Sequence, residues 1–369
     1  MFEGEVDPAA GPAAARLRRL GVELRVVCPP GAVDVFEEAG AAVTPLQVGT
    51  GVGSLSALRR VLAEGVEVVH AHGLRAGLAA TLARPGGLPL VLSWSDAVPT
   101  AGISALVARA VTRTVVPAAA AVLAATPELV AAASEFGARA LFVPPVLPDP
   151  ARLTRSPDQV REELALDARA PIVLARARLL EENRLDLLVE ASARWRREGV
   201  AGHVVLVGAG PAYRDLVARA TVARAPVTFA GERRAEASAE DERAGLEDLL
   251  AAATVAVVTD VRARPDFALR AARAGVPVVV PEDGVIGQLL GDGAIAVPAG
   301  EVGSLDETVR SLLAEPGARS VLAARARSQV ATWPDAAGAA ADLAALYERV
   351  SRATVTADTE PSDTPGGLR

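Results

Sequence analysis

The sequence predicts an α/β protein made of two doubly wound, parallel-sheet domains. Short runs rich in valine and leucine alternate with stretches of alanine, arginine and leucine that have helical periodicity. The strand-like runs are apolar throughout, which is typical of parallel sheets covered on both faces. This alternation stops once, between residues 145 and 170, and then starts again. A chain of 369 residues is long enough for two domains that each bury a core.

The first predicted domain covers residues 1–150. Its opening segment offers Gly11 ahead of a first helix but no apolar run, so we expect the first strand of the sheet to be missing. The sheet edge exposed in this way would need another partner. Helices are predicted near 54–64, 74–84, 100–116 and 127–136, and strands at 22–28, 45–48, 66–71, 88–94, 120–125 and 140–144.

The second predicted domain covers residues 151–350 and follows a linker with four prolines, which leads into a short helix. The tail 351–369 has almost no large apolar residue, so we expect it to be disordered. Helices are predicted at 185–198, 212–223, 244–252, 266–274, 303–314 and 335–350. Strands are predicted at 171–175, 203–208, 226–231, 254–260, 276–282 and 294–298.

The composition excludes several classes of function. The chain has no lysine, so neither a P-loop nor a pyridoxal Schiff base can form. The net charge is −7 and aromatic residues make up 3%, which argues against a nucleic-acid partner. Cys28 is the only cysteine, so an internal disulfide is impossible. We expect a cytoplasmic protein, because the acidic first residues lack the apolar core of a secretory leader.

A set of local motifs, taken in order, resembles one enzyme family. The motifs are IVLARARLLEENRLDLLVEA (172–191), HVVLVGAGPAYRDL (203–216), VTFAGERR (227–234), DLLAAATVAVVTD (248–260) and RAGVPVVVPEDG (273–284). Together they resemble the family 4 (group 1) glycosyltransferases of GT-B fold. This resemblance implies two Rossmann-like domains that face each other across a cleft, where a nucleotide-diphosphate sugar binds.

The resemblance also suggests which residues bind the donor. Arg178 matches an arginine that holds the diphosphate, and Asn183 stands where the family has a lysine. Gly208, Gly210 and Gly284 would shape the donor pocket, because glycine lets the backbone pass close to other groups. The segment GAGPAY is not a full dinucleotide fingerprint, since Tyr213 occupies the third glycine position, and an ordinary tight turn explains it better.

Two family glutamates are replaced in this chain. They stand eight positions apart before the strand VPVVV, and here both positions are arginine, Arg262 and Arg270. Arginine cannot accept the hydrogen bonds that carboxylates accept from ribose and sugar hydroxyls. It can instead grip phosphate with two hydrogen bonds, so both residues are candidate donor-binding residues. The alternative is that they are solvated helix-end residues.

The first half carries weaker catalytic candidates. LVLSWSD (90–96) resembles a strand whose end carries a histidine in the family, and Ser95 takes that position, with Asp96 beside it. Asp96 is a candidate base, although a helix N-cap is the simpler role. His70 and His72 alternate on one strand, but no carboxylate lies at ligand spacing, so we expect structural histidines and no metal site.

We therefore expect a glycosyltransferase that uses a nucleotide-diphosphate sugar as donor substrate and needs no cofactor. By resemblance it retains the anomeric configuration and is independent of metal. The first alternative is a catalytically inactive binding or scaffold protein that keeps nucleotide affinity. The second alternative is a nucleotide-sugar epimerase. The acceptor is not identified. A membrane-associated acceptor at the inner face of the membrane is compatible with Arg109 and Arg113, four residues apart on one predicted helix.

Overall fold

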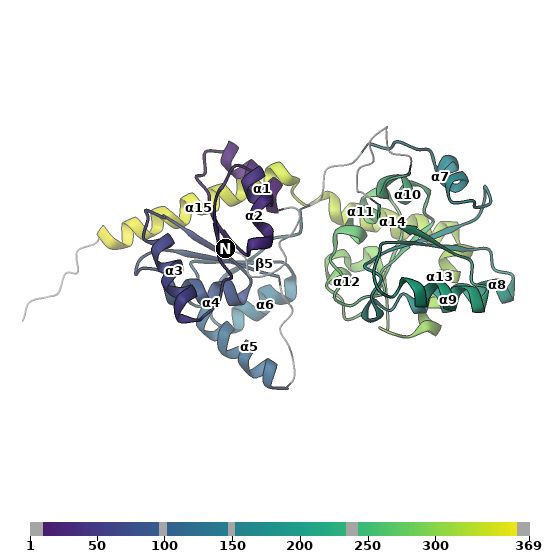
Figure 1. Cartoon of the computed structure of the whole chain (residues 1–369), viewed down its shortest axis with the longest axis horizontal. Helices are drawn as coiled ribbons and strands as arrows, with labels where there is room; N and C mark the ends of the chain where they lie inside the picture. The colour runs from purple at the N-terminus through teal and green to yellow at the C-terminus, as the bar shows by residue number, and fades with distance from the viewer. Residues whose placement is uncertain (1–9, 96–101, 147–151, 234–242, 360–369) are drawn as a thin grey trace, which may run out of the picture. The chain divides into compact units, whose positions relative to one another are not determined.

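The structure is a computed structural model that describes residues 10–95, 102–146, 152–233 and 243–359 (Figure 1). The chain divides into two compact units. Unit 1 comprises Met1–Pro144 and Ala336–Arg369, and unit 2 comprises Pro145–Asp335. Both are α/β units with parallel sheets, as predicted. In the part of the chain that is described, no helix has the length and apolar character needed to cross a membrane.

Unit 1 contains a two-stranded sheet, β1–β2, and a four-stranded sheet in the order β3–β4–β5–β6. Within each sheet the strands are parallel. The strands are β1 (Arg25–Cys28), β2 (Ala42–Pro45), β3 (Val69–His72), β4 (Leu90–Trp94), β5 (Ala121–Ala124) and β6 (Ala140–Phe142). The helices are α1 (Ala10–Arg19), η1 (Pro30–Ala32), α2 (Val33–Glu38), α3 (Val52–Leu62), α4 (Leu74–Ala83), α5 (Gly102–Val115), α6 (Pro127–Glu135) and α15 (Ala336–Thr359).

The two sheets of unit 1 share a core although β1 and β3 are not paired. Val27 of β1 belongs to the same buried cluster as Val69 and Ala71 of β3. Arg25, at the start of β1, donates a 2.9 Å hydrogen bond to the carbonyl oxygen of Glu64, which precedes β3. The neighbouring edges of β1 and β3 thus have no strand partner within the described ranges. The predicted absence of a strand ahead of α1 concerns residues outside those ranges and stays a prediction.

One strand of unit 1 was predicted at the wrong residues. The sequence pattern favoured 45–48, whereas β2 ends at Pro45. The side chains of β2 are half-buried or exposed, so this strand lacks the continuous apolar run that marks the other strands. Its partner β1 determines its position through the pairing of Val26 with Val43.

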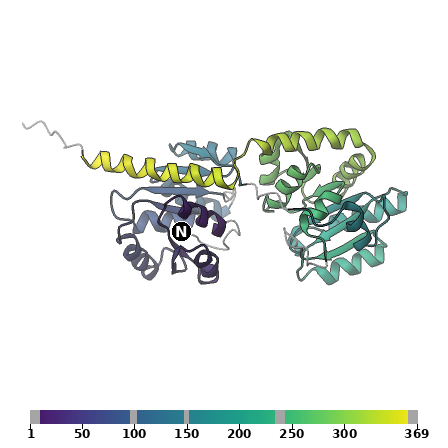
Figure 2. The same cartoon turned by 90° about the horizontal axis from the view of Figure 1, so that it is seen from above.

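The C-terminal helix corrects the predicted domains and the predicted tail. The interval 151–350 was assigned to the second domain, but α15 belongs to unit 1 (Figures 1 and 2). Leu346 and Val350 of α15 pack in one buried cluster with Val91 and Leu123 of the four-stranded sheet. The helix continues to Thr359, so residues 351–359 are helical and not disordered. Burial of Leu346 and Val350 on the sheet offsets the entropy of ordering this helix, which then continues through residues 351–359. Residues 360–369 lie outside the described part.

Unit 2 contains one six-stranded parallel sheet in the order β12–β11–β10–β7–β8–β9. The strands are β7 (Ile172–Arg176), β8 (His203–Val207), β9 (Val227–Gly231), β10 (Val255–Val257), β11 (Val278–Pro281) and β12 (Ala294–Val297). The helices are α7 (Pro157–Glu163), η2 (Glu181–Asn183), α8 (Asp186–Glu198), α9 (Tyr213–Ala223), α10 (Leu246–Ala252), α11 (Asp266–Ala274), α12 (Val285–Leu290), η3 (Gly291–Gly293), α13 (Val302–Ala314) and α14 (Pro316–Ala331).

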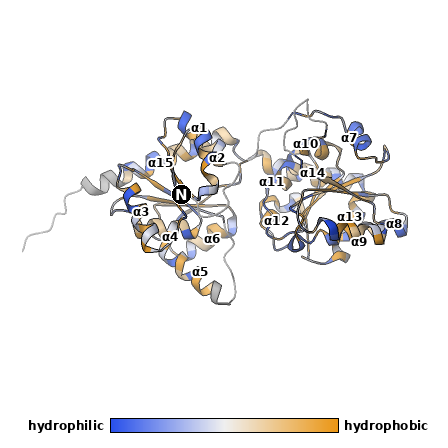
Figure 3. Ribbon diagram, in the orientation of Figure 1, coloured by the Kyte–Doolittle hydropathy of each residue, from blue (hydrophilic) through white to orange (hydrophobic). Residues whose placement is uncertain are grey.

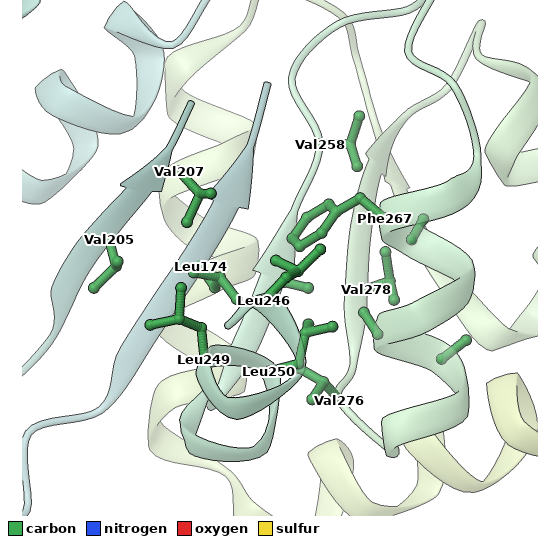
Figure 4. Packing of buried hydrophobic residues seen from close by; sticks show 14 of the residues in the cluster. Leu174, Val205, Val207, Leu246, Leu249, Leu250, Val258, Phe267, Val276 and Val278 are labelled. Carbon is green, nitrogen blue, oxygen red and sulfur yellow. The ribbon is translucent and has the colours of Figure 1, made fainter. Parts of the chain in front are cut away.

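Two hydrophobic clusters cover the two faces of this sheet. Leu174 points into one cluster while its neighbours Val173 and Ala175 point into the other, which explains why β7 is apolar at successive positions. The strands of unit 2 are mostly hydrophobic, whereas the helices also carry many hydrophilic residues (Figure 3). Figure 4 shows Phe267 of α11 and Leu246 of α10 packed in the first cluster. This core fixes the positions of the strand ends.

The segment before α7 is tied to unit 2 by Asp248 of α10. The Asp248 carboxylate accepts hydrogen bonds from the Thr154 backbone and hydroxyl at 2.8 and 2.7 Å, from Arg155 N at 3.1 Å and from Gly245 N at 3.0 Å. Burial alone would raise the pKa of Asp248, but these hydrogen bonds outweigh it and hold the pKa below its usual value.

We expect Asp248→Asn to lower the free energy of unfolding of unit 2 by about 2 kcal/mol, because an amide nitrogen cannot accept two of these bonds. Since the native pKa is depressed, the carboxylate stabilises the fold above its unfolded pKa, and this contribution disappears as the pH falls below about 4. Urea denaturation at pH 7 and pH 3 measures both effects. The difference between wild type and variant should shrink at pH 3, and a constant difference would contradict the assignment.

Candidate functional site

The strand order of unit 2 indicates where a ligand would bind. The chain leaves β7 toward β8 and β9, then returns to the other side of β7 to form β10, β11 and β12. The direction of winding therefore reverses between β7 and β10. In open parallel sheets, ligands bind outside the carboxyl ends of the strands at such a switch point. We define the carboxyl edge as the segments that follow these strands: 176–183, 208–213, 231–233, 258–266 and 281–284.

Two glycines bring the turns after β7 and β8 into contact. Gly208 has a φ of 142°, and a Cβ atom there would overlap the carbonyl oxygen of Ala177. At Gly210 a Cβ atom would overlap the carbonyl oxygen of Leu179. Backbone hydrogen bonds from Ala177 N to Val207 O (3.1 Å) and from Leu179 N to Ala209 O (2.9 Å) continue the β7–β8 pairing beyond the strands. Gly208 and Gly210, which were predicted to shape the donor pocket, thus allow the segment after β7 to continue in an extended conformation beside the β8 turn.

This extended backbone exposes two arginines at the end of the central strand. Arg176 and Arg178 are both exposed, while Leu179 is buried. Side chains alternate along an extended chain, so Arg176 and Arg178, two residues apart, lie on the same side. Within the described ranges, the Arg178 guanidinium has no ion-pair or hydrogen-bond partner. It is therefore available to an anionic ligand.

The side chain of Asn183 is hydrogen-bonded to the backbone of Arg178. Asn183 is only 8% exposed, and its side-chain amide donates a 2.7 Å hydrogen bond to the carbonyl oxygen of Arg178. Its own carbonyl oxygen accepts a 2.5 Å bond from the hydroxyl of Thr259, which follows β10. The amide is thus engaged within the protein and positions the Arg178 backbone. Direct contact of Asn183 with a donor stays a prediction.

The segment after β10 brings further charges to the carboxyl edge. Asp260 Oδ1 accepts a 2.9 Å hydrogen bond from the backbone N–H of Arg262, which closes a turn. The Arg262 side chain is exposed, and no described residue pairs with its guanidinium. Asp266, in the first turn of α11, forms an ion pair with Arg176 across the switch point, with 2.5 Å between Oδ2 and Nη1. Arg176, Arg178 and Arg262 make this edge favourable for a phosphate group.

Arg270 is engaged elsewhere. Its guanidinium lies 2.5 Å from Glu247 Oε1 on α10, and the two side chains are 13% and 11% exposed. A buried arginine must be paired, and Glu247 satisfies this requirement. The pair joins α10 to α11. Arg270 could therefore bind a donor phosphate only if its ion pair with Glu247 were broken or shared.

Gly284 lies in the loop between β11 and α12, as the N-cap residue of α12. A Cβ atom there would lie 3.2 Å from Pro281 O and 3.3 Å from Val261 O. This loop therefore packs closely against the turn that carries Arg262. The structure thus brings Arg178, Arg262 and the three predicted glycines to the same edge of the unit 2 sheet.

The predicted catalytic pair belongs to unit 1. Ser95 follows β4 and is exposed, and Asp96 lies outside the described residues. A polar cluster lies on the neighbouring strand β3. His70 Nδ1 is 2.5 Å from the Tyr347 hydroxyl of α15, and His70 Nε2 is 2.8 Å from Ser93 Oγ of β4. The rings of His70 and His72 stack with centroids 4.3 Å apart.

Burial determines the protonation of this cluster. Loss of solvation lowers the pKa of His70 to about 3 and lowers that of His72 as well, and it raises the pKa of Tyr347. The Tyr347 phenol therefore keeps its proton and can donate to a neutral His70. Across the described ranges, no group of three or more His, Cys, Asp or Glu side chains could hold a metal ion.

Sequence reasoning missed two residues of this edge, Arg176 and Asp266, and it also missed Glu247 of α10, which pairs with Arg270. Arg176 is the last residue of a strand and interrupts its apolar run, which is a signal that a polar group faces the carboxyl edge. Asp266 and Glu247 carry no such signal. Their partners lie 90 and 23 residues away in the chain, and strand order brings each pair together.

Two family models match the chain, one in each half. Residues 4–146 match the model described as a glycosyl transferase 4-like domain, and residues 170–315 match the model described as glycosyl transferases group 1. These intervals include the four-stranded sheet of unit 1 and all six strands of unit 2. No curated protein sequence matches the chain.

Solved structures show the same architecture over nearly the whole chain. Anabaena HepE in complex with UDP has a TM-score of 0.72 and 16% identity, covering 94% of this chain and 98% of that one. Sucrose-phosphate synthase from Thermosynechococcus elongatus has a TM-score of 0.72 and 18% identity, covering 95% of each. WaaG, a glycosyltransferase involved in lipopolysaccharide biosynthesis, has a TM-score of 0.66 and 17% identity, covering 94% and 97%. With its two parallel-sheet units and both family domains, the chain belongs to the group 1 glycosyltransferases of GT-B fold.

Proposed function

We propose that this protein transfers a sugar from a nucleotide-diphosphate sugar to an acceptor, with unit 2 as the donor-binding unit. The observation that carries the proposal is the exposed guanidinium of Arg178 at the switch point of the unit 2 sheet, which has no partner among the described residues. Arg262 adds a second cation at the same edge. A diphosphate is the dianionic group that such a pair of guanidinium groups recognises. HepE, which has the same fold, was crystallised with UDP and with UDP-glucose, which supports this class of donor.

The chain's own residues supply electrostatic stabilisation. In sugar transfer the nucleoside diphosphate leaves with its negative charge, and cations held in place beforehand stabilise that charge most as it develops. The Gly208 and Gly210 turn and the Asn183 amide hold the Arg178 backbone, which keeps the base of this side chain at the carboxyl edge. Retention of configuration, independence of metal, and roles for Ser95 and Asp96 remain proposals by family resemblance. A cytoplasmic location is a proposal from the sequence composition, and an acceptor at the inner face of the membrane is a proposal by family resemblance.

The first experiment is a calorimetric titration of the full chain with UDP and with GDP. We expect one of the two to bind and Arg178→Ala to lower its affinity by about 10- to 100-fold, because a hydrogen-bonded charge contact is lost. Arg310→Ala is a suitable control. Arg310 pairs with Glu198 at the opposite, amino-terminal edge of the sheet, and its removal should leave the affinity unchanged.

A donor-hydrolysis assay with the matching nucleotide sugars then distinguishes transfer from binding alone. Hydrolysis that depends on Arg178 supports the transferase. Binding without turnover of any donor would favour an inactive binding protein. If neither nucleotide binds, or if Arg178→Ala binds as well as wild type, the donor site is not at this edge.

A further inference from the structure

The backbone edges of β1 and β3 border the same core of unit 1 without pairing. β1 pairs with β2 and β3 pairs with β4, and no other described strand pairs with β1 or β3. Val27 of β1 shares a buried cluster with Val69 and Ala71 of β3. A side chain links the two segments, because Arg25 donates a hydrogen bond to the carbonyl oxygen of Glu64 ahead of β3.

The backbone of Val27 has no hydrogen-bond partner among the described residues. Ala42 N of β2 donates a 3.2 Å hydrogen bond to the carbonyl oxygen of Leu24. Leu46 N donates a 2.8 Å bond to the carbonyl oxygen of Cys28. In a parallel pair, alternate residues bond to the same neighbour, so the N–H and C=O of Val27 point away from β2 and toward β3. Val27 is only 5% exposed, and a buried backbone donor and acceptor require partners.

Unit 2 has a strand at the position where unit 1 has these two edges. In unit 2 the first strand, β7, is central, with β8 and β9 on one side and β10, β11 and β12 on the other. In unit 1 the chain forms β1 and β2 as one group and then β3, β4, β5 and β6 as the other. A strand between β1 and β3 that comes first in the chain would give unit 1 the winding order of unit 2.

Helix α1 indicates where this strand lies in the chain. α1 packs on β1 through Ala14, which shares a buried cluster with Val26 and Cys28, and it lies against α2 and α15 (Figure 1). In a parallel sheet, a helix that leads into one strand comes from another strand of the same direction. α1 is the first described element, so its preceding strand belongs to the chain ahead of it.

The position also determines the chemistry of the strand. One buried cluster lies on each face of β1, so a strand beside β1 is covered on both faces and is apolar at successive positions. Residues 1–9 do not fit this requirement, because they include three carboxylates, Glu3, Glu5 and Asp7. A segment ahead of Met1 would leave nine residues to reach α1, which is long enough for a connection between a strand and a helix.

We propose that β1 and β3 bind one further strand, apolar at successive positions and parallel to β1, which is carried by a segment ahead of Met1. Its backbone pairs with Val27 on one side and with the edge of β3 on the other, and it joins the two sheets of unit 1 into one. The direction of winding reverses at this strand, so the residues after it join the ligand site of unit 1. The inference does not rest on the proposed function, because it concerns the sheet of unit 1 alone.

The first test is residue-resolved amide hydrogen exchange of the full chain. We expect Val27 to exchange at least about 10-fold faster than Val26, whose N–H faces β2. Val26 is a matched comparison, because it is the preceding residue of the strand and is 7% exposed, compared with 5% for Val27. Equal protection of the two amides would overturn the inference, because residues 1–9 or a second copy of the chain would then already pair with β1.

The second test adds the segment Val-Val-Leu-Val-Val ahead of Met1. We expect this extension to slow the exchange of the Val27 amide by at least about 10-fold, because its N–H gains a strand partner. A matched extension, Val-Pro-Leu-Pro-Val, is apolar and equally long but lacks two N–H donors and cannot pair as an inner strand. It should leave Val27 unchanged. The amides of β9 in unit 2 are the internal control and should exchange equally in all three proteins.

Two results of the second test would also overturn the inference. One is unchanged exchange at Val27 with the valine-rich extension. The other is equal slowing by both extensions, which would indicate apolar cover without strand pairing. Thermal melting establishes that each extended protein is folded, and the first test needs no variant.

Discussion

Replacing Gly208 by alanine is expected to lower the free energy of unfolding of unit 2 by about 3 kcal/mol or more. Gly208 has a φ of 142°, a conformation that residues with a Cβ atom rarely adopt. The new methyl group would also overlap the carbonyl oxygen of Ala177, which is backbone and cannot rotate away. The chain would have to break the pairing of the β7 and β8 turns. Urea denaturation followed by circular dichroism measures the loss.

The same substitution at Gly303 is the control. Gly303 lies in α13 of unit 2, is exposed, and has open space where a Cβ atom would be added. Alanine is a better helix former than glycine, so Gly303→Ala should raise stability by about 0.5–1 kcal/mol. Because the β7 turn carries Arg178, any Gly208→Ala protein that folds should also bind UDP or GDP more weakly. Equal denaturation midpoints for wild type and Gly208→Ala would refute the close contact.

Acidification is expected to destabilise unit 1 strongly through the His70 cluster. Burial lowers the pKa of His70 to about 3, whereas the unfolded chain has the ordinary value near 6.5. Between these values the unfolded state binds more protons than the native state, so stability is complete above about pH 6.5 and falls as the pH decreases toward 3. The full difference corresponds to about 4–5 kcal/mol. Protonated His70 would have an N–H donor at both ring nitrogens. Its Nδ1 could then no longer accept the hydrogen bond that the Tyr347 hydroxyl donates to neutral His70.

The variant His70→Gln separates this effect from the other titrating groups. Between pH 6 and pH 4.5, His70 should account for a loss of about 2 kcal/mol in wild-type unit 1, in addition to the loss from His72, whose pKa burial also lowers. The variant should lose less by about that amount, because glutamine does not titrate. His203→Gln in unit 2 is the comparison, since burial also lowers the pKa of His203 but this residue does not contact α15. The measurement is urea denaturation as a function of pH. Parallel curves for wild type and His70→Gln would show that His70 is not the group responsible.

Much of the fold follows from local patterns because strands of a parallel sheet are buried on both faces. Strand β7 was predicted at 171–175 and is found at Ile172–Arg176, and helix α11 was predicted and found at 266–274. The pattern fails where burial is incomplete. Strand β2 is half-exposed and was predicted a few residues too late. Helix α14 was not predicted, and the charged positions of Pro316–Ala331 give it little amphipathic contrast.

The sequence alone also determined part of the candidate site. The motif order identified the family, and the glycines at 208 and 210 indicated a close backbone approach that the structure contains. The sequence could not tell that Arg270 would be paired with Glu247, or that Asn183 would be buried beneath Arg178. Each of these partners depends on the arrangement of neighbouring elements and not on the residue types within one motif.

The amino-acid pattern by itself established two α/β units with parallel sheets, because the period and continuity of apolar residues record which sides of each element are buried. Only the tertiary structure decided which charges meet. Arg176 and Asp266 are 90 residues apart, and His70 and Tyr347 are 277 residues apart. The contacts exist because the strand order places β10 beside β7 and because α15 packs on the sheet of unit 1. The sequence pattern does not show which residues become neighbours in this way. A charged residue at the end of a strand or helix fits the pattern equally well whether or not it has a distant partner.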